Sequence, residues 1–583
     1  MTEDATPTPL SKTQASCLQL LRNARTDEEK FAGLLLIPRV FDSQNERQMV
    51  TLLTHLDVAF IQRLLYSTDH SDADSYREVG LAVLASFCVH WNLLNHPVLL
   101  SLLPHLIHTL KESVEKRNES LLKDTVPILV QVAAHPEGLK RLRDEGDTLV
   151  PTLITLIHST SIDESLCGQA VRIIGQLLGY PPRYHPGDQQ DTNSSTFALH
   201  CRVWATTFRG SAQLLYSEQR QLKFEILGAI CDALSSIQTN EGAQNLADLY
   251  FTKSDKQSSL QPSHMGFQIL HSLLLIKLTM LSILRQSHGS FEQKDVALLL
   301  IAQLVRLFGH AFFVPVGSSQ FAPLRKELLA RDHSTDTCIN LGDVFTTVQE
   351  TEEVRCFSLW LRMASIEFRM LLDERMLVPP DQSLAEIPAK RQEWMLPACL
   401  TILEAAIHYL AWVDDAPHNT DLTLEQSSSN LDLEKTHIAL SLTYLEKVAH
   451  VYMTSLNKDE VLTWLNCLKE SFSAAVVYLE ELQTRGALTK ALNETVTLAV
   501  VRGLCCWLAQ DLTLLTDHPQ LPHLLQAIIA SETLREITGH FIRPVVQLWL
   551  DSIVLDSGPD SKIFTPSVCE LVRHMGQTLT LLP

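Results

Sequence analysis

The chain has 583 residues, of which 47 are basic and 67 are acidic, so its formal net charge is −20. Apolar residues make up 45% and charged residues 20%, which is typical of a folding chain with a large core and excludes a disordered one. The length indicates three or more domains, or one elongated repeat array. The acidic excess speaks against nonspecific nucleic-acid binding, which requires a basic face.

The amino terminus and the cysteines favour the cytosol. Met1–Asp4 is acidic and polar with no apolar run behind it, so we expect no secretory signal. The cysteines form no Cys-x-x-Cys pair, which favours reduced, buried thiols. The longest apolar stretch, Gly266–Leu284, contains His271 and Lys277, so a buried helix is favoured over a membrane span. We therefore predict a cytosolic protein without a membrane span.

Helix starts are marked by hydroxyl residues followed three positions later by Glu or Gln. In this capping-box spacing, each side chain binds the backbone N–H of the other residue. Apolar runs follow four such pairs, which are Thr26/Glu29, Ser75/Glu78, Ser161/Glu164 and Ser290/Gln293. Gly179 and Gly309 are predicted to end helices in the left-handed conformation. Because no two-residue alternation bounded by hairpin turns is evident, the predicted fold class is all-α.

Prolines precede three successive apolar runs. Proline suits the first turn of a helix, because its missing N–H would have no partner there. We therefore expect new helices to begin at Pro104, Pro127 and Pro151. Short helices at this interval cannot bury their apolar faces alone and must stack on their neighbours. The pattern predicts an armadillo/HEAT-like α-solenoid, a right-handed superhelix of stacked short helices, in preference to a compact helical bundle.

Polar stretches rich in proline, glycine and serine interrupt the helical pattern. The predicted linkers are Tyr180–Thr196, Gln238–Ser263, Val314–Phe345, Val378–Pro388 and Asp414–Asn430. The expected organisation is a flexible N-terminus (1–14), N-terminal armadillo-like helices (15–179), a middle helical block (197–377), a C-terminal helical block (390–555) and a short C-terminal extension (556–583).

Several segments resemble, in the same order, parts of the neurochondrin family. Thr26–Leu36 is similar to the family's opening segment, and Pro136–Pro151 resembles an early armadillo-like repeat. The other similar segments are Ala364–Glu374, the predicted helix that contains Lys469 and Glu470, and Val501–Ala509. The resemblance covers roughly residues 15–180 and 350–512, whereas residues 200–345 are only weakly similar. Neurochondrins typically continue well beyond the point that matches Leu512, so we expect a shortened or an incomplete member.

The resemblance implies a cytosolic, armadillo-like protein without known catalysis. Animal members are associated with neurite outgrowth, dendrites and the modulation of receptor and kinase signalling. It also implies structural or partner contacts for the residues that match the family's motifs, which are Glu367, Arg369, Lys469, Glu470, Arg502 and Trp507. Glu367 and Arg369 lie two apart and face different sides of a helix, so we expect the arginine to bridge to a neighbouring helix.

Three patterns have alternative chemical interpretations. His105 and His108 would share a helix face, but no further ligands or HExxH base accompany them, so we predict no metal site. Glu404 and His408 also share a face, and a structural pair is favoured over a catalytic one. The adjacent Cys505 and Cys506 cannot form an ordinary disulfide on a helix and are predicted to be packed thiols.

The leading hypothesis is a non-enzymatic scaffold or adaptor that binds basic or amphipathic segments of protein partners through a solenoid groove. No GxSxG, GxxxxGK[ST] or GxGxxG motif is present, and we predict no catalytic residues and no cofactor. A transport or trafficking receptor is the alternative. An enzyme with an unrecognised site in residues 200–345 is less favoured, and the oligomeric state stays open.

Overall fold

The structure is a computed structural model, and it describes residues 11–66, 73–181, 194–237, 262–286, 290–313, 350–377, 386–415, 458–531, 535–555 and 564–580. These residues form 24 α-helices and contain no strand, which confirms the all-α prediction. The chain divides into two compact units, unit 1 (Met1–Gln244) and unit 2 (Asn245–Pro583). The predicted middle block spans this division, and most residues of the predicted linkers lie outside the described residues.

Unit 1 consists of successive short helices that group in threes. Each of the groups α3–α4–α5, α6–α7–α8 and α9–α10–α11 ends with its longest helix. The bounds are α1 (Lys12–Asn23), α2 (Asp27–Val40), α3 (Glu46–Leu53), α4 (Val58–Leu65), α5 (Ala73–Cys88), α6 (Pro97–Ser101), α7 (Leu103–Lys116), α8 (Glu119–Ala134), α9 (Pro136–Asp144), α10 (Gly146–His158), α11 (Glu164–Leu178), α12 (Ser194–Ser217) and α13 (Leu222–Ser236).

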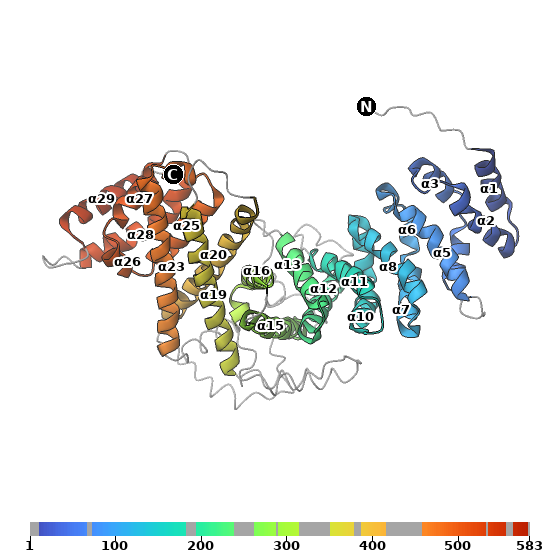
Figure 1. The fold of residues 1–583 in the computed structure, drawn as a ribbon, viewed down its shortest axis with the longest axis horizontal. Coiled ribbons are helices and arrows are strands. Elements are labelled where there is room, and N and C mark those ends of the chain that lie inside the picture. The colour runs from blue at the N-terminus through green and yellow to red at the C-terminus, as the bar shows by residue number, and fades with distance from the viewer. Residues whose placement is uncertain are drawn as a thin grey trace. The chain divides into compact units, whose positions relative to one another are not determined.

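The helices of unit 1 stack in two layers (Figure 1). One layer contains α4, α7, α10 and α12, and the other contains α5, α8, α11 and α13, with each helix packed against the next in its layer. The apolar faces meet between the layers, where Leu122, Leu153 and Ile173 are fully buried. A short amphipathic helix buries its apolar face only by such stacking, so the predicted solenoid of stacked short helices is confirmed.

The predicted capping boxes are partly correct. Thr26 and Ser290 cap α2 and α16 (Phe291–Phe308) with the predicted reciprocal hydrogen bonds. The prediction is wrong at Ser75, because α5 already includes the two residues before it. It is also wrong at Ser161, because the side chain of Asp163 accepts the hydrogen bond at the start of α11. Asp163 lies immediately before the helix, in the position from which a side-chain oxygen reaches the first free N–H groups.

Two of the three proline predictions are wrong. Pro104 lies in the first turn of α7, but Pro127 lies inside α8 and Pro151 lies inside α10. Each helix begins earlier because the residues before the proline, including Leu122 and Val150, are also buried. The core contacts of these residues offset the single backbone hydrogen bond that each proline removes.

The two glycines predicted to end helices behave differently. Gly309 follows α16 with a positive φ of 48°, a conformation that favours glycine. Gly179 follows α11 with φ −66°, so the left-handed prediction is wrong there. A Cβ at Gly179 would lie 3.0 Å from Oγ of Ser236, and the close approach of α13 accounts for the glycine instead.

Unit 2 contains longer helices, again packed in succession. Its helices are α15 (Pro262–Arg285), α16 (Phe291–Phe308), α19 (Glu350–Leu377), α20 (Glu386–Asp415), α23 (Lys458–Thr484), α24 (Leu488–Ala491), α25 (Thr495–Leu508), α26 (Thr513–Asp517), α27 (Leu521–Ala530), α28 (Arg535–Leu555) and α29 (Pro566–Thr580). Helix α20 packs against α16, α19 and α25, and α19 packs against α23. The predicted C-terminal extension contains α29, which packs on α27 and α28.

Two helices among the described residues are long and apolar enough to cross a membrane, Gln268–Arg285 and Arg391–Ala411. Both pack against other helices of unit 2, with 78% and 56% of the two segments buried. Lys277 in the first is fully buried, with its Nζ 3.6 Å from the carboxylate of Glu353 and over the rings of Phe312 and Phe357. Both helices therefore serve as core helices of this unit.

Candidate functional site

The residues of the family-like motifs lie where helices of unit 2 meet. Arg369 of α19 donates a hydrogen bond to Glu470 of α23, with Nη1 2.7 Å from the carboxylate. In the preceding residue of α23, Lys469, the Nζ atom lies 2.8 Å from the carboxylate of Asp517 at the end of α26. These ion pairs therefore link α19 to α23 and α23 to α26.

Glu367 belongs to a more buried charge cluster. It pairs with Arg391 of α20, which also binds Asp295 of α16 through Nε and Nη2 at 2.7 and 2.8 Å. Asp295 is only 7% exposed, and the hydrogen bonds that Arg391 donates to it raise the pKa of Arg391. This cluster joins α16, α19 and α20 by charge-assisted hydrogen bonds.

Arg502 and Trp507 connect α25 to its neighbours. Arg502 binds both carboxylate oxygens of Glu404 on α20, and the ring of Trp507 stacks on Phe472 of α23 with centroids 6.1 Å apart. Glu404 is therefore engaged by an arginine, while His408 is exposed one turn further along α20. This placement is that of a structural carboxylate.

The two adjacent thiols are packed in α25. Cys505 is buried and Cys506 is half-buried. Burial raises the pKa of Cys506 to about 11 and raises the pKa of Cys505 as well. Both thiols are protonated at neutral pH, which disfavours a nucleophilic role.

The histidine pair of α7 contacts an aromatic ring. His105 and His108 both pack on Tyr66, with ring centroids 4.9 and 4.6 Å away. Burial and the neighbouring His108 lower the pKa of His105. Across the described ranges, the structure contains no group of three or more His, Cys, Asp or Glu side chains that could hold a metal ion.

Helices α19 and α23 run parallel, side by side. Three hydrogen bonds fix their register, and the residue numbers on both helices rise together: Trp464 to Ser358, Ser471 to Ser365, and Arg375 to Tyr478. In this register, residues 366–377 of α19 lie beside residues 470–481 of α23. Their outward-facing side chains therefore form one continuous surface.

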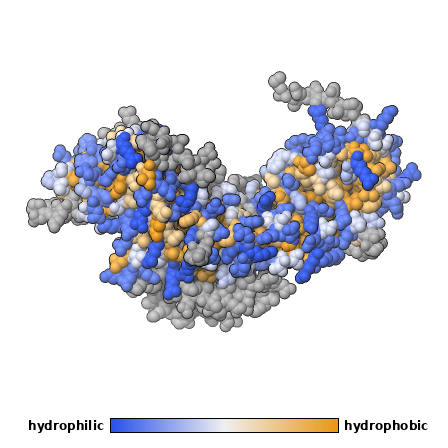
Figure 2. Space-filling view, in the orientation of Figure 1, coloured by the Kyte–Doolittle hydropathy of each residue, from blue (hydrophilic) through white to orange (hydrophobic). Residues whose placement is uncertain are grey.

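Four large apolar side chains are exposed on this surface, which we call the α19–α23 surface. They are Ile366 (46% exposed), Met370 (48%), Leu377 (82%) and Val477 (44%). The ion pair of Arg369 with Glu470 lies among them. Figure 2 shows apolar areas interrupted by polar ones on the face of unit 2 that carries α19 and α23. Exposed apolar side chains rimmed by charges are typical of protein interaction sites.

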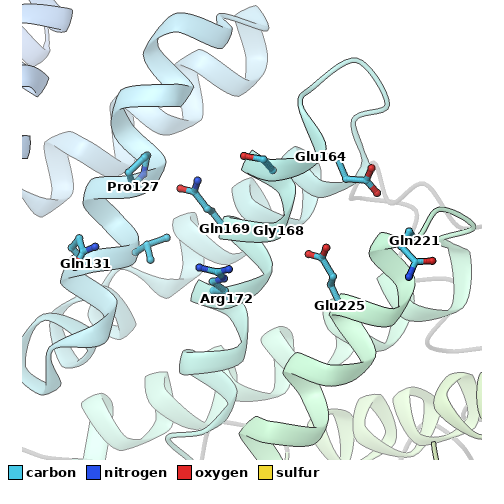
Figure 3. A pocket seen from close by; sticks show the side chains of 10 residues that line it. Pro127, Gln131, Glu164, Gly168, Gln169, Arg172, Gln221 and Glu225 are labelled. Atoms are coloured by element: carbon cyan, nitrogen blue, oxygen red, sulfur yellow. The ribbon is translucent and has the colours of Figure 1, made fainter. Parts of the chain in front are cut away.

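Unit 1 has a groove of about 570 Å³ between α8, α11 and α13 (Figure 3). Residues of α8, α11 and α13 line it, together with Gln221 just before α13; they are Pro127, Val130, Gln131, Glu164, Ser165, Gly168, Gln169, Arg172, Gln221 and Glu225. We call it the α8–α11–α13 groove. Charged and amide side chains from three helices line much of it, and the sequence patterns did not bring these residues together.

The family comparison covers both candidate surfaces. The sequence model of the Neurochondrin family matches residues 8–175 and 273–533, which include every ion-pairing residue described above. The chain belongs to the Neurochondrin family. The match contains most of the α8–α11–α13 groove, except Gln221 and Glu225, and all of the α19–α23 surface. The resemblance to the neurochondrin family that the sequence segments indicated is thus confirmed.

Among neurochondrin relatives, the "Neurochondrin homolog" of Drosophila melanogaster is 21% identical over 543 residues, covering 91% of this chain and 58% of that protein. "Neurochondrin" of Gallus gallus is 30% identical over 146 residues, covering 24% of this chain and 20% of that protein. "Neurochondrin" of Homo sapiens is 29% identical over 160 residues, covering 26% of this chain and 22% of that protein. The chain therefore covers less than two thirds of each of these curated relatives.

Solved structures give distant matches to this neurochondrin-family chain. An engineered protein has 12% identity and a TM-score of 0.36, covering 90% of this chain and 99% of that chain. Kap121p bound to Pho4p has 10% identity and a TM-score of 0.23, covering 100% of this chain and 68% of that chain. The fold assignment rests on the helix packing described above.

Proposed function

We propose that this neurochondrin-family chain is a non-enzymatic scaffold or adaptor that binds protein partners through its helical surfaces. The observation that carries the proposal is the α19–α23 surface. Its four apolar side chains are exposed although the fold buries most of the large apolar residues around them. An apolar surface that the described fold leaves uncovered and that charges surround suits a partner with a matching apolar face.

An amphipathic helix is the partner segment that fits this surface best. Ile366 and Met370 are one turn apart on α19, and Val477 lies on the parallel helix beside them. A partner helix lying along α19 and α23 would place apolar residues, one turn apart, against the exposed apolar side chains of both helices. The net charge of −20 favours partner segments whose polar face is basic.

Family membership supports an extension of this proposal. The family resemblance implies roles in neurite outgrowth and in receptor and kinase signalling, and we propose that this chain acts as a cytosolic adaptor of that kind. The α19–α23 surface would then bind the cytosolic segment of a receptor or kinase. The presence of the surface in the family-matched part of the chain supports this view.

The test compares partners captured by the full chain and by two double variants. Met370→Asp/Val477→Asp places charges on the α19–α23 surface, and Ile537→Asp/Val554→Asp places the same charges at exposed apolar positions of α28. Quantitative mass spectrometry of partners from native cytosol should show a receptor- or kinase-type partner lost only by the first variant. Identical partner sets for the wild type and the first variant would overturn the proposal.

A further inference from the structure

We propose that the α8–α11–α13 groove is a second binding site, which takes an extended peptide segment carrying a lysine or an arginine. This inference rests on the proposed adaptor function and deepens it, because it assigns a ligand class to a site in the other unit. Three observations support it: the unpaired carboxylates of the groove, its amide side chains, and the close approach of Glu225 to Gly168.

Two carboxylates of the groove form no ion pair within the described residues, although Arg220 acts on Glu164 electrostatically at longer range. Glu164 lies in the first turn of α11 and Glu225 lies near the start of α13, and both side chains are exposed. Within the described residues, neither carboxylate lies within 4.0 Å of a lysine, arginine or histidine nitrogen, whereas many other exposed acidic side chains are paired. Two unpaired carboxylates in one groove favour a ligand that supplies a cation.

A glycine lets one of these carboxylates reach across the groove. A Cβ at Gly168 of α11 would lie 2.7 Å from Oε2 of Glu225, closer than the two atoms can approach. Figure 3 shows Glu225 projecting from α13 toward α11, on the same side as Arg172. The absence of a side chain at residue 168 therefore leaves the space in which the Glu225 carboxylate lies over α11.

The remaining polar groups match a peptide backbone. Gln131, Gln169 and Gln221 each offer an amide donor and an amide acceptor, and these side chains make no hydrogen bond within the described fold. Arg172 adds donors and makes no ion pair there. A helical ligand uses its N–H and C=O groups internally, whereas an extended segment leaves them free for such side chains. The groove chemistry therefore selects an extended segment in preference to a helix.

The size of the groove limits the length of the ligand. A volume of about 570 Å³ lies in the range of sites that enclose a small ligand, so it holds only a few residues at a time. The basic side chain would lie between Glu164 and Glu225, and the flanking backbone would bind the glutamines and Arg172. A short basic stretch within a longer partner suits this geometry.

The experiment uses the full chain and fluorescein-labelled octapeptides of threonine, valine and proline with one central lysine, glutamine or glutamate. Fluorescence polarisation should show the lysine peptide binding about ten-fold more tightly than the glutamine peptide, and the glutamate peptide binding least. Glu164→Gln/Glu225→Gln should remove this preference. Glu115→Gln/Glu137→Gln is the matched control, because both residues are exposed in unit 1 and Glu137 lies in the first turn of α9 as Glu164 does in α11.

Three outcomes would overturn the inference. They are no preference for lysine, an equal loss of binding in the control variant, and competition by N-acetyl-lysine amide as strong as that by the peptide, which would show that the backbone contributes nothing. Each leaves the adaptor proposal intact if Met370→Asp/Val477→Asp still loses partners. Conversely, the lysine peptide should bind this variant as it binds the wild type. The peptide site in the groove can therefore be confirmed even if the proposal for the α19–α23 surface is overturned.

Discussion

Arg502 of α25 and Glu404 of α20 form a doubly hydrogen-bonded ion pair, in which Nε and Nη2 of the arginine each lie 2.9 Å from a carboxylate oxygen. The adjacent Gly503 brings the two helices close, since a Cβ there would lie 2.8 Å from Cδ2 of Leu400 and 3.4 Å from Oε1 of Glu404. The ion pair and the glycine therefore fix the same α20–α25 contact: the ion pair attracts the two helices, and the glycine lets them approach closely.

These two contributions should differ in size. Gly503→Ala forces a methyl group against Leu400 in the core and should lower the free energy of unfolding by about 1–3 kcal/mol. Arg502→Lys removes the paired geometry at a half-exposed site and should cost about 1 kcal/mol or less. Urea unfolding of both variants tests the order, and a larger cost for the lysine variant would contradict it.

The buried cluster around Arg391 should be much more sensitive to substitution than the exposed ion pair of Arg369 with Glu470. Arg391→Ala leaves Asp295 buried without its cation and should cost about 3–5 kcal/mol. Arg369→Ala breaks the more exposed pair with Glu470 and should cost about 1 kcal/mol or less, which makes it the matched control. Denaturant titrations of both variants give the comparison. Equal costs would show that Asp295 is solvated by other means.

Acid should weaken unit 1 through Glu218. A hydrogen bond from Arg220 lowers the pKa of this carboxyl from 4.5 to about 2. A depressed folded-state pKa contributes stability that is complete above pH 4.5 and is lost as the pH falls toward 2, by up to about 3 kcal/mol. Unfolding free energies between pH 7 and pH 2 should therefore fall less in Glu218→Gln than in the wild type. Parallel curves for the two proteins would exclude this contribution.

Gly168→Ala should separate stability from peptide binding. Alanine is favoured over glycine in a helix, and the clashing atom is the end of the flexible Glu225 side chain, so unfolding should cost the same or about 1 kcal/mol more. The displaced carboxylate should nevertheless weaken binding of the lysine octapeptide. Thermal unfolding and fluorescence polarisation of the same preparation measure both effects, and unchanged binding would contradict the role given to Gly168.

Local patterns predicted the fold class and part of its boundaries. The boxes at Thr26 and Ser290 were correct because capping depends on residues within one turn. The helix starts at Pro127 and Pro151 were wrong because burial of the preceding residues, a tertiary effect, outweighed the missing N–H of proline. The competing cap at Asp163 shows that two nearby polar residues cannot be ranked by spacing alone.

The candidate sites were harder to predict. The family-like residues included Arg369 and Glu470, which form an ion pair. The ion pair of Arg391 with Asp295 is more buried, and neither residue belongs to a recognised motif. The groove residues lie on three helices, so only the stacking brings them together. Gly168, a glycine inside a strongly helical pattern, was the one local sign of a close approach there.

The layered packing of unit 1 has a mechanical consequence. Each third helix packs mainly on the third helix before it and the one after it, so neighbouring repeats are joined by a series of similar interfaces. Strain applied between two repeats is shared among these interfaces, each of which yields slightly, and no single one has to open. Small changes at successive interfaces of such an array add up along the stack, so a peptide bound across α8, α11 and α13, as proposed above, would set the spacing of these three helices.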